Sequence, residues 1–317
     1  MFLLYLLSCQ APVSDLFRVE KKDIASFSLD AKYWMTFHQC HTQKVDCFDP
    51  MKHETRVAFS QNGLSWKVLS QIPPFQGSVP DILIRDEELY VFSLPKLHRM
   101  SPKQKEEEIA HFHVLDEADQ LVLQVDPSPI LDEKGRIVLF FLVGIAGVDP
   151  ARCPQAQRQC TKQFRSATEI AGSKGKRFRL DPGIRAEITI TQGHFASDPD
   201  VFLGPDGYYL YISRGAQVQA LFSKTLKGTF SSIQSLPNGM LSRNTGGVPA
   251  GVYDHKEKRF HTFITRHKGG HRTEIHMASH RDFSKSLDSS AFTPVITPHF
   301  LGDRDLSIAS PGVIISD

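Results

Sequence analysis

Acidic residues beside proline recur at the start of short apolar runs, and they are the residues best suited to chemistry. Asp81 lies in VPDILI, Asp126 in VDPSPI, and Asp198 and Asp200 in SDPDVF. Converging carboxylates raise one another's proton affinity, so they can divide into a general acid and a general base, as glycoside hydrolysis requires. We predict Asp81, Asp126 and Asp200 as catalytic residues and Asp198 as a substrate-binding residue. The structural alternative is that each Asp caps a turn and each Pro starts an extended segment.

These openings belong to a longer repeated pattern. Its clearest copy, residues 197–230, runs from the opening through a turn with Asp and Gly into an alternating aromatic strand, and then into another apolar strand. Other copies start near residues 23, 79, 125 and 247, and residues 309–317 repeat the opening alone. Alternating strands broken by Gly, Pro, Asp and Asn predict all-β structure, and repeats of this length predict the four-stranded blades of a β-propeller.

Five complete copies predict one five-bladed domain over residues 23–317. The orphan sixth opening can pair with the N-terminal segment, so that both chain ends build one blade. Residues 24–30 and 310–317 both resemble an innermost strand, and six blades are therefore the alternative. In the second copy we assign residues 111–115 to the third strand and the charged stretch 101–110 to a surface excursion.

Strand direction predicts where the openings meet. In an antiparallel four-stranded blade, the start of the first strand and the end of the second lie on the same face. The acidic openings should therefore ring a central funnel, together with the basic residues that end the second strands. These basic residues can hold hydroxyls, carboxylates or sulfates. The predicted substrate-binding set is His38, Lys96, Arg214, Arg266 and His267.

Four cysteines form two equally spaced pairs, Cys40 with Cys47 and Cys153 with Cys160. Each pair lies between the second and third strand of a copy. Two local disulfides in an oxidising compartment are the simple interpretation. A four-cysteine metal site is the alternative, but zinc sites favour shorter spacings. The disulfides should stiffen two loops around the funnel.

The N-terminus resembles the end of a secretory signal. Residues 1–8, MFLLYLLS, are almost purely apolar and too short to span a bilayer. LLSC at 6–9 resembles a bacterial lipobox, in which Cys9 would be lipidated; an accidental Cys is the alternative. We expect a signal segment over 1–9, a linker over 10–22, and an exported protein of the bacterial cell envelope that is anchored to the membrane by lipid.

Composition limits the partners. The net charge of +2 gives no electrostatic case for nucleic acid. We predict carbohydrate as the partner, no required cofactor and no metal-ligating set.

Two segments carry a family resemblance. DPSPILDEKGRIVLFF at 126–141 and SDPDVFLGPDGYYLYISRG at 197–215 resemble blade openings of the five-bladed glycosidase propellers, which include glycoside hydrolase families 43 and 32, the arabinanases and the levansucrases. SQNGLSW at 60–66 resembles the shortened Asp-box turns of sialidase-like propellers. The resemblance covers the repeats from about residue 23 to the end, and its short motifs specify fold better than function.

The resemblance to family 43 implies an Asp base, an Asp modulator and a Glu acid in three blades. It places Asp81 at the base and Asp126 at the modulator. At the acid position the chain departs, with Asp198 and Asp200 where Glu before Gly-Pro is expected, and Glu187 lies upstream. Family members often hold a cation on the propeller axis, for which the sequence identifies no ligands. Three hypotheses result: a glycoside hydrolase, a non-catalytic surface propeller that binds a glycan or a protein, or a structural component of the envelope with no small ligand.

Overall fold

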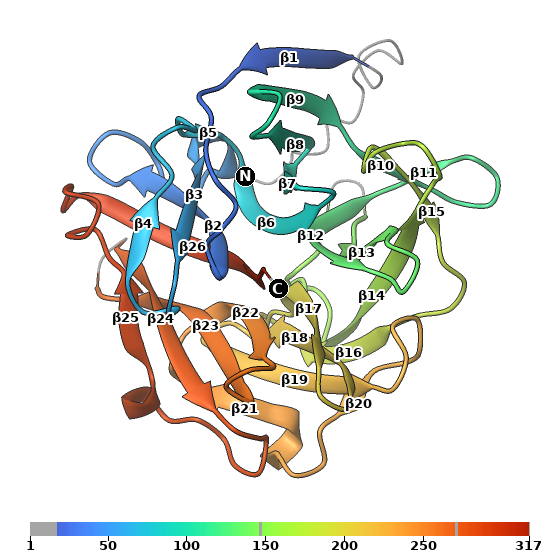
Figure 1. The fold of residues 1–317 in the computed structure, drawn as a ribbon. Coiled ribbons are helices and arrows are strands. Elements are labelled where there is room, and N and C mark those ends of the chain that lie inside the picture. The colour runs from blue at the N-terminus through green and yellow to red at the C-terminus, as the bar shows by residue number, and fades with distance from the viewer. Residues whose placement is uncertain (1–17, 146–147, 270–271, 317) are drawn as a thin grey trace.

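The chain folds into five sheets around a central axis, as Figure 1 shows, and their strands are antiparallel except for one parallel pair in the third sheet. The structure is a computed structural model that describes residues 18–145, 148–269 and 272–316. This architecture confirms the prediction of an all-β propeller with five blades and makes the six-bladed alternative wrong. No helix in the described part of the chain is long and apolar enough to cross a membrane. Cys9, the predicted lipidation site, lies outside the described residues.

Each blade is built outward from one innermost strand next to the axis. The first blade has β26 (Leu306–Ile315), β2 (Tyr33–His41), β3 (Glu54–Ser60), β4 (Trp66–Val68) and β5 (Phe75–Gln76); the second has β6 (Ser78–Arg85), β7 (Glu88–Leu94), β8 (Lys96–Ser101), β9 (Glu106–His111) and β1 (Val19–Asp23). The third has β12 (Gln124–Leu131), β13 (Ile137–Val143), β14 (Gln159–Glu169), β15 (Arg177–Leu180), β16 (Ala186–Thr191), β10 (His113–Leu115) and β11 (Leu121–Val122). The fourth has β17 (Ser197–Gly204), β18 (Gly207–Ser213), β19 (Gln217–Ser223), β20 (Ser231–Ser232) and β21 (Met240–Arg243); the fifth has β22 (Gly247–Asp254), β23 (Arg259–His267), β24 (Thr273–His280) and β25 (Thr293–Ile296).

The first blade combines the last strand of the described chain with strands from its N-terminal part. Strand β26 is innermost and pairs with β2, so that Ile314 lies opposite Trp34. Residues 24–30 form no strand, which resolves the conflict between the two candidate innermost segments. The fifth blade is joined to the first by Asp254, whose Oδ2 accepts a 2.6 Å hydrogen bond from the Tyr33 hydroxyl. Lys32 Nζ lies 2.5 Å from the same oxygen.

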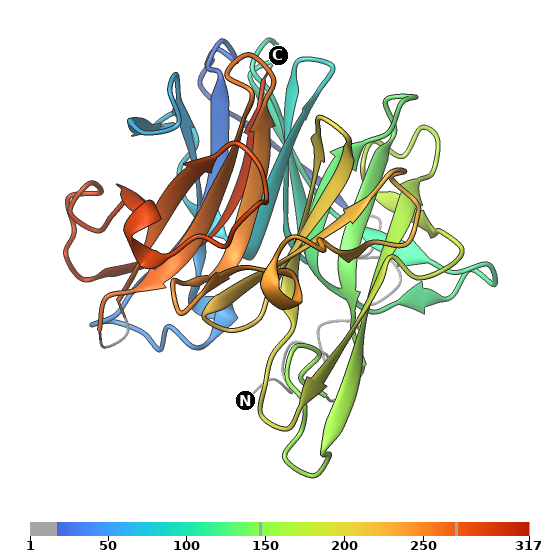
Figure 2. The same ribbon diagram turned by 90° about the horizontal axis from the view of Figure 1, so that it is seen from below.

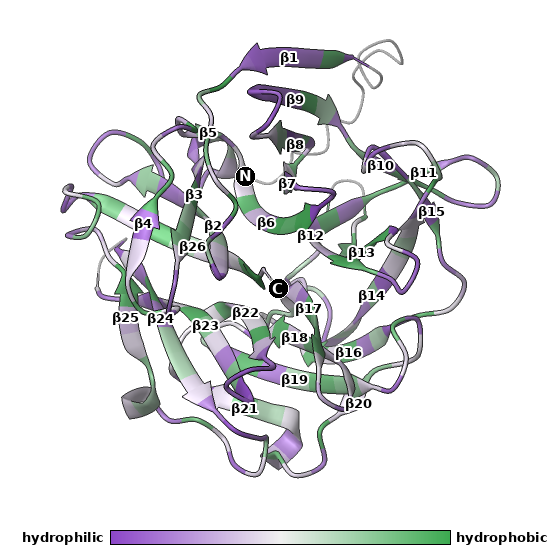
Figure 3. Cartoon of the chain, viewed as in Figure 1, coloured by the Kyte–Doolittle hydropathy of each residue, from purple (hydrophilic) through white to green (hydrophobic). Residues whose placement is uncertain are grey.

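The hydrophobic core lies between blades, where the alternating strands face each other. Trp34 is fully buried, and Tyr209 stacks against Phe283 with ring centroids 5.0 Å apart. Tyr208, its neighbour in β18, is half-buried on the other side of the strand. Hydrophobic residues are concentrated in the inner and middle strands, whereas the outer strand β1 is largely hydrophilic (Figure 3).

The second blade differs from its sequence assignment. Its third strand is β8, not 111–115, and the charged stretch 101–110 ends in strand β9. Glu108 of β9 is held by Arg99 at 2.5 Å and by Lys176 at 3.0 Å, so the charges that suggested an excursion are paired within the sheet. The predicted linker also differs, because residues 19–22 form most of β1, which pairs with β9.

Candidate active site at the propeller funnel

All five innermost strands begin with the same irregularity. In each strand a residue with positive φ stands directly before a proline, and the pairing with the second strand shifts there by a β-bulge. The five residues and their φ angles are Val79 (46°), Asp126 (54°), Asp198 (48°), Val248 (48°) and Ser310 (55°). Such a left-handed residue other than glycine costs roughly 1 to 3 kcal/mol, so its fivefold repetition marks it as part of the architecture.

The bulge divides the acidic residues into two sets. Asp126 and Asp198 precede the proline, whereas Asp81 and Asp200 follow it. Asp81 and Asp126 are therefore not equivalent positions of two blades, although both segments contain Val, Pro and Asp. The first set lies where the inner strands begin, which we call the funnel, and the second lies further along the axis.

Hydrogen bonds at the funnel join neighbouring blades at four of the five junctions. The backbone N–H of the residue before proline donates to a side chain that ends the second strand of the preceding blade. The pairs are Val79 to His38 Nδ1 (3.3 Å), Val248 to Ser213 Oγ (3.0 Å) and Ser310 to Thr265 Oγ1 (3.0 Å). Between the third and fourth blades the acceptor is different: Asp198 N–H donates to Asp126 Oδ2 at 3.1 Å.

Asp126 and Asp198 are half-buried, and both carboxyl groups have raised pKa values. Burial raises the pKa of Asp198 to about 6, against a 2.6 Å hydrogen bond from Ser197 Oγ that favours the ionised form. Burial raises the pKa of Asp126 well above its usual value, and the nearby charges of Asp198 and Asp149 raise it further. Each group therefore keeps its proton to a higher pH than an exposed Asp does, and two neighbouring carboxyl groups of this kind can divide into an acid and a base.

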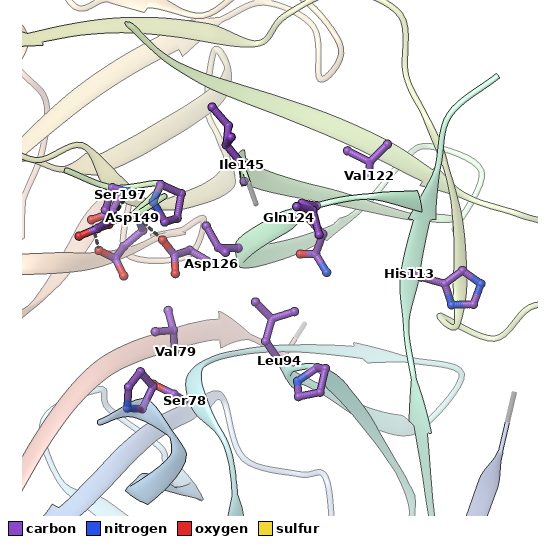
Figure 4. A pocket seen from close by; sticks show the side chains of 18 of the residues that line it. Ser78, Val79, Leu94, His113, Val122, Gln124, Asp126, Ile145, Asp149 and Ser197 are labelled. Atoms are coloured by element: carbon purple, nitrogen blue, oxygen red, sulfur yellow. Dashed lines mark hydrogen bonds between the residues drawn. The ribbon is translucent and has the colours of Figure 1, made fainter. Parts of the chain in front are cut away.

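The pair opens into a cavity of about 330 Å³, the funnel cavity, which lies among the second, third and fourth blades. Figure 4 shows Asp126 and Asp149 along one side of it, with Val79 and Leu94 opposite. The amide of Gln124 points into the space between them. A ligand in this cavity would therefore touch carboxyl groups on one side and apolar side chains on the other.

Asp81 and Asp200 line a second cavity of about 430 Å³, the axial cavity, formed by all five inner strands beyond the proline. Both side chains are more than nine-tenths buried. Asp200 Oδ2 accepts from Gly251 N–H at 2.7 Å, and Asp81 Oδ1 accepts from Ile82 N–H at 2.7 Å. Burial raises the pKa of Asp81 to about 7; burial and the charge of Asp81 raise that of Asp200 well above its usual value. The structure thus does not bring Asp81, Asp126 and Asp200 together in one site.

The basic residues predicted for substrate binding are not among the residues that line the funnel cavity: His38, Lys96, Arg214, Arg266 and His267. His38 is buried and stacked on His53 with ring centroids 4.0 Å apart. Burial, with His53 beside it, lowers the pKa of His38 well below its usual value, so the ring is neutral and serves the blade junction. Arg214 donates from Nε to the carbonyl of Phe195 at 3.1 Å.

Asp149 and Gln124 line the funnel cavity and were not predicted from the sequence. A signal for Asp149 was present, because Asp149 and Pro150 repeat the Asp-Pro dipeptide in the loop between β13 and β14. Asp149 Oδ1 caps that loop by accepting from Ala151 N–H at 2.9 Å. Gln124 has no signal of its own, since its position at the first residue of β12 depends on the strand register.

Both predicted disulfides are present, Cys40–Cys47 and Cys153–Cys160, in the connections between the second and third strands of their blades. Beyond the second disulfide, β14 pairs with β16 to form a long arm. In Figure 2 this arm, coloured yellow-green, extends beyond the body on the side opposite the C-terminus.

Two further groups have donor atoms close enough to hold a cation: His41 with Asp303 and Asp305, and Asp254 with Glu257 and His261. In the second group Lys32 already neutralises Asp254. None of these residues lines the funnel cavity. Beside the second group, residues 252, 253 and 255 line the axial cavity.

Solved structures similar to this chain are family 43 glycoside hydrolases. The GH43_1 enzyme from Xanthomonas citri, complexed with xylotriose, is 16% identical with a TM-score of 0.52, over 94% of this chain and 100% of the other. A thermostable family-43 glycoside hydrolase is 10% identical with a TM-score of 0.53, over 84% and 92%. An exo-1,5-α-L-arabinanase from a bovine ruminal metagenomic library is 14% identical with a TM-score of 0.50, over 88% and 98%.

The sequence comparisons are negative, since no protein-family profile and no curated protein matches the chain. At these identities the structural likeness is one of fold. It confirms the resemblance of the blade openings to glycosidase propellers. The chain therefore has the five-bladed propeller fold of the family 43 glycoside hydrolases.

Proposed function

We propose that this protein hydrolyses a glycosidic bond in its funnel cavity, with Asp126 as the general acid and Asp198 as the general base. The observation that carries the proposal is the pair itself: two neighbouring carboxyl groups, open to one cavity, whose surroundings raise their pKa values. This assignment keeps Asp126 from the predicted catalytic set, adds Asp198, which was predicted to bind substrate, and leaves out Asp81 and Asp200.

The proposed reaction uses both carboxyl groups, one for each proton that moves. Asp126 gives its proton to the oxygen of the leaving group as the bond from that oxygen to the anomeric carbon breaks. Asp198 takes a proton from a water molecule as the water oxygen bonds to the same carbon. Proton transfer by a positioned side chain contributes typically about 100- to 10,000-fold to the rate.

Carbohydrate is the proposed substrate class, supported by the fold and by what is bound to a protein of the same fold, the GH43_1 enzyme with xylotriose. Export is part of the proposal, supported by two disulfides, which persist in oxidising compartments. The proposal also includes lipidation at Cys9 and a place in the bacterial cell envelope, and these two parts rest on the sequence alone. No cofactor is required in this proposal.

The test is a screen for sugar release from xylo- and arabino-oligosaccharides by the wild-type protein and its Asp126→Asn and Asp198→Asn variants. Each substitution is expected to lower kcat by about 100-fold or more. Asp206→Asn, in the exposed turn between β17 and β18, is the matched control and should keep full activity. Unchanged turnover in both funnel variants would refute the assignment.

A second candidate function is binding of a glycan or protein without turnover. It is favoured by the hydrogen bond from Asp198 N–H to Asp126 Oδ2, because this bond gives the carboxyl group a structural role at a blade junction. Saturable binding of an oligosaccharide with no product, even at protein concentrations near that of the ligand, would support this second function over the first.

A further inference from the structure

The funnel cavity is lined mainly by apolar side chains; its polar lining residues are Asp126, Asp149, Ser197 and Asp198 and, elsewhere on its walls, Ser78, His111, His113 and Gln124. Its walls include side chains from the second blade and from the segments that lead into and follow β12: Val79, Leu94, Phe112, Val122 and Leu123. At its rim Ile145, Leu121 and Val148 are 61%, 46% and 36% exposed. Large apolar side chains that cluster on a surface beside a cavity are typical of a binding site.

One polar group in this apolar region lacks a partner. Gln124 Oε1 is buried, and no donor among the described residues lies within hydrogen-bond distance of it. A buried carbonyl oxygen without a partner is unfavourable, and an O–H or N–H brought by a ligand would satisfy it. Gln124 is therefore the group that would orient a ligand whose remaining surface is apolar.

A sugar chain does not suit these walls. Each sugar ring carries several hydroxyl groups, and each hydroxyl that leaves water without a new hydrogen bond is penalised. Val79 and Leu94, which lie opposite Asp126 and Asp149, offer no side-chain partner to the hydroxyl groups of a sugar.

We infer that the apolar part of the funnel cavity binds the leaving group of a glycoside, and that this group is mainly apolar and donates one hydrogen bond to Gln124. The inference rests on the proposed function, since Asp126 and Asp198 must then flank the bond between the sugar and this group. The cavity volume of about 330 Å³ lies within the range of small-molecule sites and can hold a bicyclic aromatic group.

The first measurement compares two free probes, naphthalene-2,6-diol, which keeps a second phenolic O–H when its first oxygen carries a sugar, and 6-methoxy-2-naphthol, which lacks that second O–H. Wild-type protein should bind the diol about tenfold more tightly, as expected for one hydrogen bond. Gln124→Leu should reduce this ratio to about one, whereas Gln120→Leu, in the exposed turn before β11, should preserve it. Ile145→Glu, at a largely exposed rim position that does not threaten folding, should weaken both probes.

The second measurement uses methyl and 4-methylumbelliferyl β-D-xylosides and α-L-arabinofuranosides with the Asp126→Asn variant. Burial of the aromatic group should make the aryl glycosides bind roughly 10- to 100-fold more tightly than the methyl glycosides of the same sugar. Equal affinities would overturn the inference, and release of sugar from oligosaccharides by wild type would still uphold the proposed function. If the free probes bind but no glycoside is bound or hydrolysed, the proposed function fails, and the assignment to a glycoside fails with it.

Discussion

The carboxyl group of Asp126 accepts a hydrogen bond from the backbone N–H of Asp198 at 3.1 Å, across the junction of the third and fourth blades. At three other junctions the N–H of the residue before proline donates to a neutral side chain of the preceding blade: His38, Ser213 or Thr265. At this junction Asp126 therefore takes the structural place of a neutral acceptor, and its carboxyl group can also supply a proton at the funnel.

Two substitutions at position 126 should separate these roles. Asp126→Asn keeps an oxygen that can accept from Asp198 N–H but cannot donate a carboxylic proton. It should remove activity while leaving the free energy of unfolding at or above that of wild type. Asp126→Ala leaves the N–H unpaired and should lower the free energy of unfolding by about 1–3 kcal/mol. Urea denaturation at pH 7 measures both effects.

Ser213→Ala provides the comparison for this pair of variants, because it removes the equivalent acceptor, that of Val248 N–H, at the next junction. It should lose stability to a similar degree as Asp126→Ala and keep its activity. Equal stability of the Asn and Ala variants at position 126 would mean that the bond to Asp198 does not hold the junction.

The axial pair, Asp81 and Asp200, should make stability fall as pH rises. A carboxyl group with a raised folded-state pKa keeps its proton where the unfolded chain has lost it, so ionisation favours unfolding in that range. For Asp81 the range runs from the ordinary value of 3.8 to about 7. Asp81→Asn should therefore match wild type near pH 4 and be more stable by roughly 2–4 kcal/mol near pH 7.

The measurement is the difference in unfolding free energy between variant and wild type at several pH values. Buried histidines such as His38 and His280 have lowered pKa values and act in the opposite direction below pH 6.5, but they are common to both proteins and cancel. Asp206→Asn, at an exposed turn, should show no such pH dependence. A constant difference between Asp81→Asn and wild type would contradict a raised pKa at Asp81.

The blade number could be predicted from the sequence because the repeat itself counts blades. Ring closure by the orphan opening followed from the same count, and β26 takes the innermost place. Both disulfides followed from two cysteine pairs of equal spacing. These features depend on local patterns that the chain repeats.

The composition of the site could not be predicted, because it depends on one-residue differences in register. VPD around Asp81 and VDP around Asp126 look alike, but the left-handed residue of the bulge always stands directly before the proline. Asp126 takes this position, whereas Asp81 lies two residues further along its strand. A shift of one residue moves a side chain to a different environment in any strand. Arg214 likewise lies at the predicted strand end, but its side chain donates to the backbone carbonyl of Phe195 and does not line the funnel cavity.

The two disulfides should contribute similar stability, because each closes a loop with the same sequence separation of 7. For loops of this length the chain-entropy argument gives about 2–3 kcal/mol. The Cys40→Ala/Cys47→Ala and Cys153→Ala/Cys160→Ala variants should each lose up to that amount in urea denaturation. A much larger loss for the first variant would point instead to His53, whose Nε2 donates to the Cys47 carbonyl at 3.0 Å.

Ring closure should depend on the hydroxyl of Tyr33, which donates to Asp254 Oδ2 at 2.6 Å between the first and fifth blades. Burial alone would raise the pKa of Asp254, but the hydrogen bonds from Lys32 and Tyr33 outweigh it and hold that pKa well below its usual value. A carboxylate of this kind contributes stability above its ordinary pKa of 3.8 that is lost as the pH falls through the lower folded-state value.

Tyr33→Phe should therefore lower the free energy of unfolding by about 1.5–3 kcal/mol at pH 7, the usual contribution of a hydrogen bond to a charged group. The loss should shrink toward pH 2, because the variant lacks the hydrogen bond from Tyr33 and so protonates Asp254 at a higher pH than wild type does. Tyr208→Phe is the matched control, since no partner of its hydroxyl is found among the described residues and it should cost little at either pH. A loss that is the same at both pH values would mean that Tyr33 stabilises the ring by packing alone, without a specific bond to the Asp254 carboxylate.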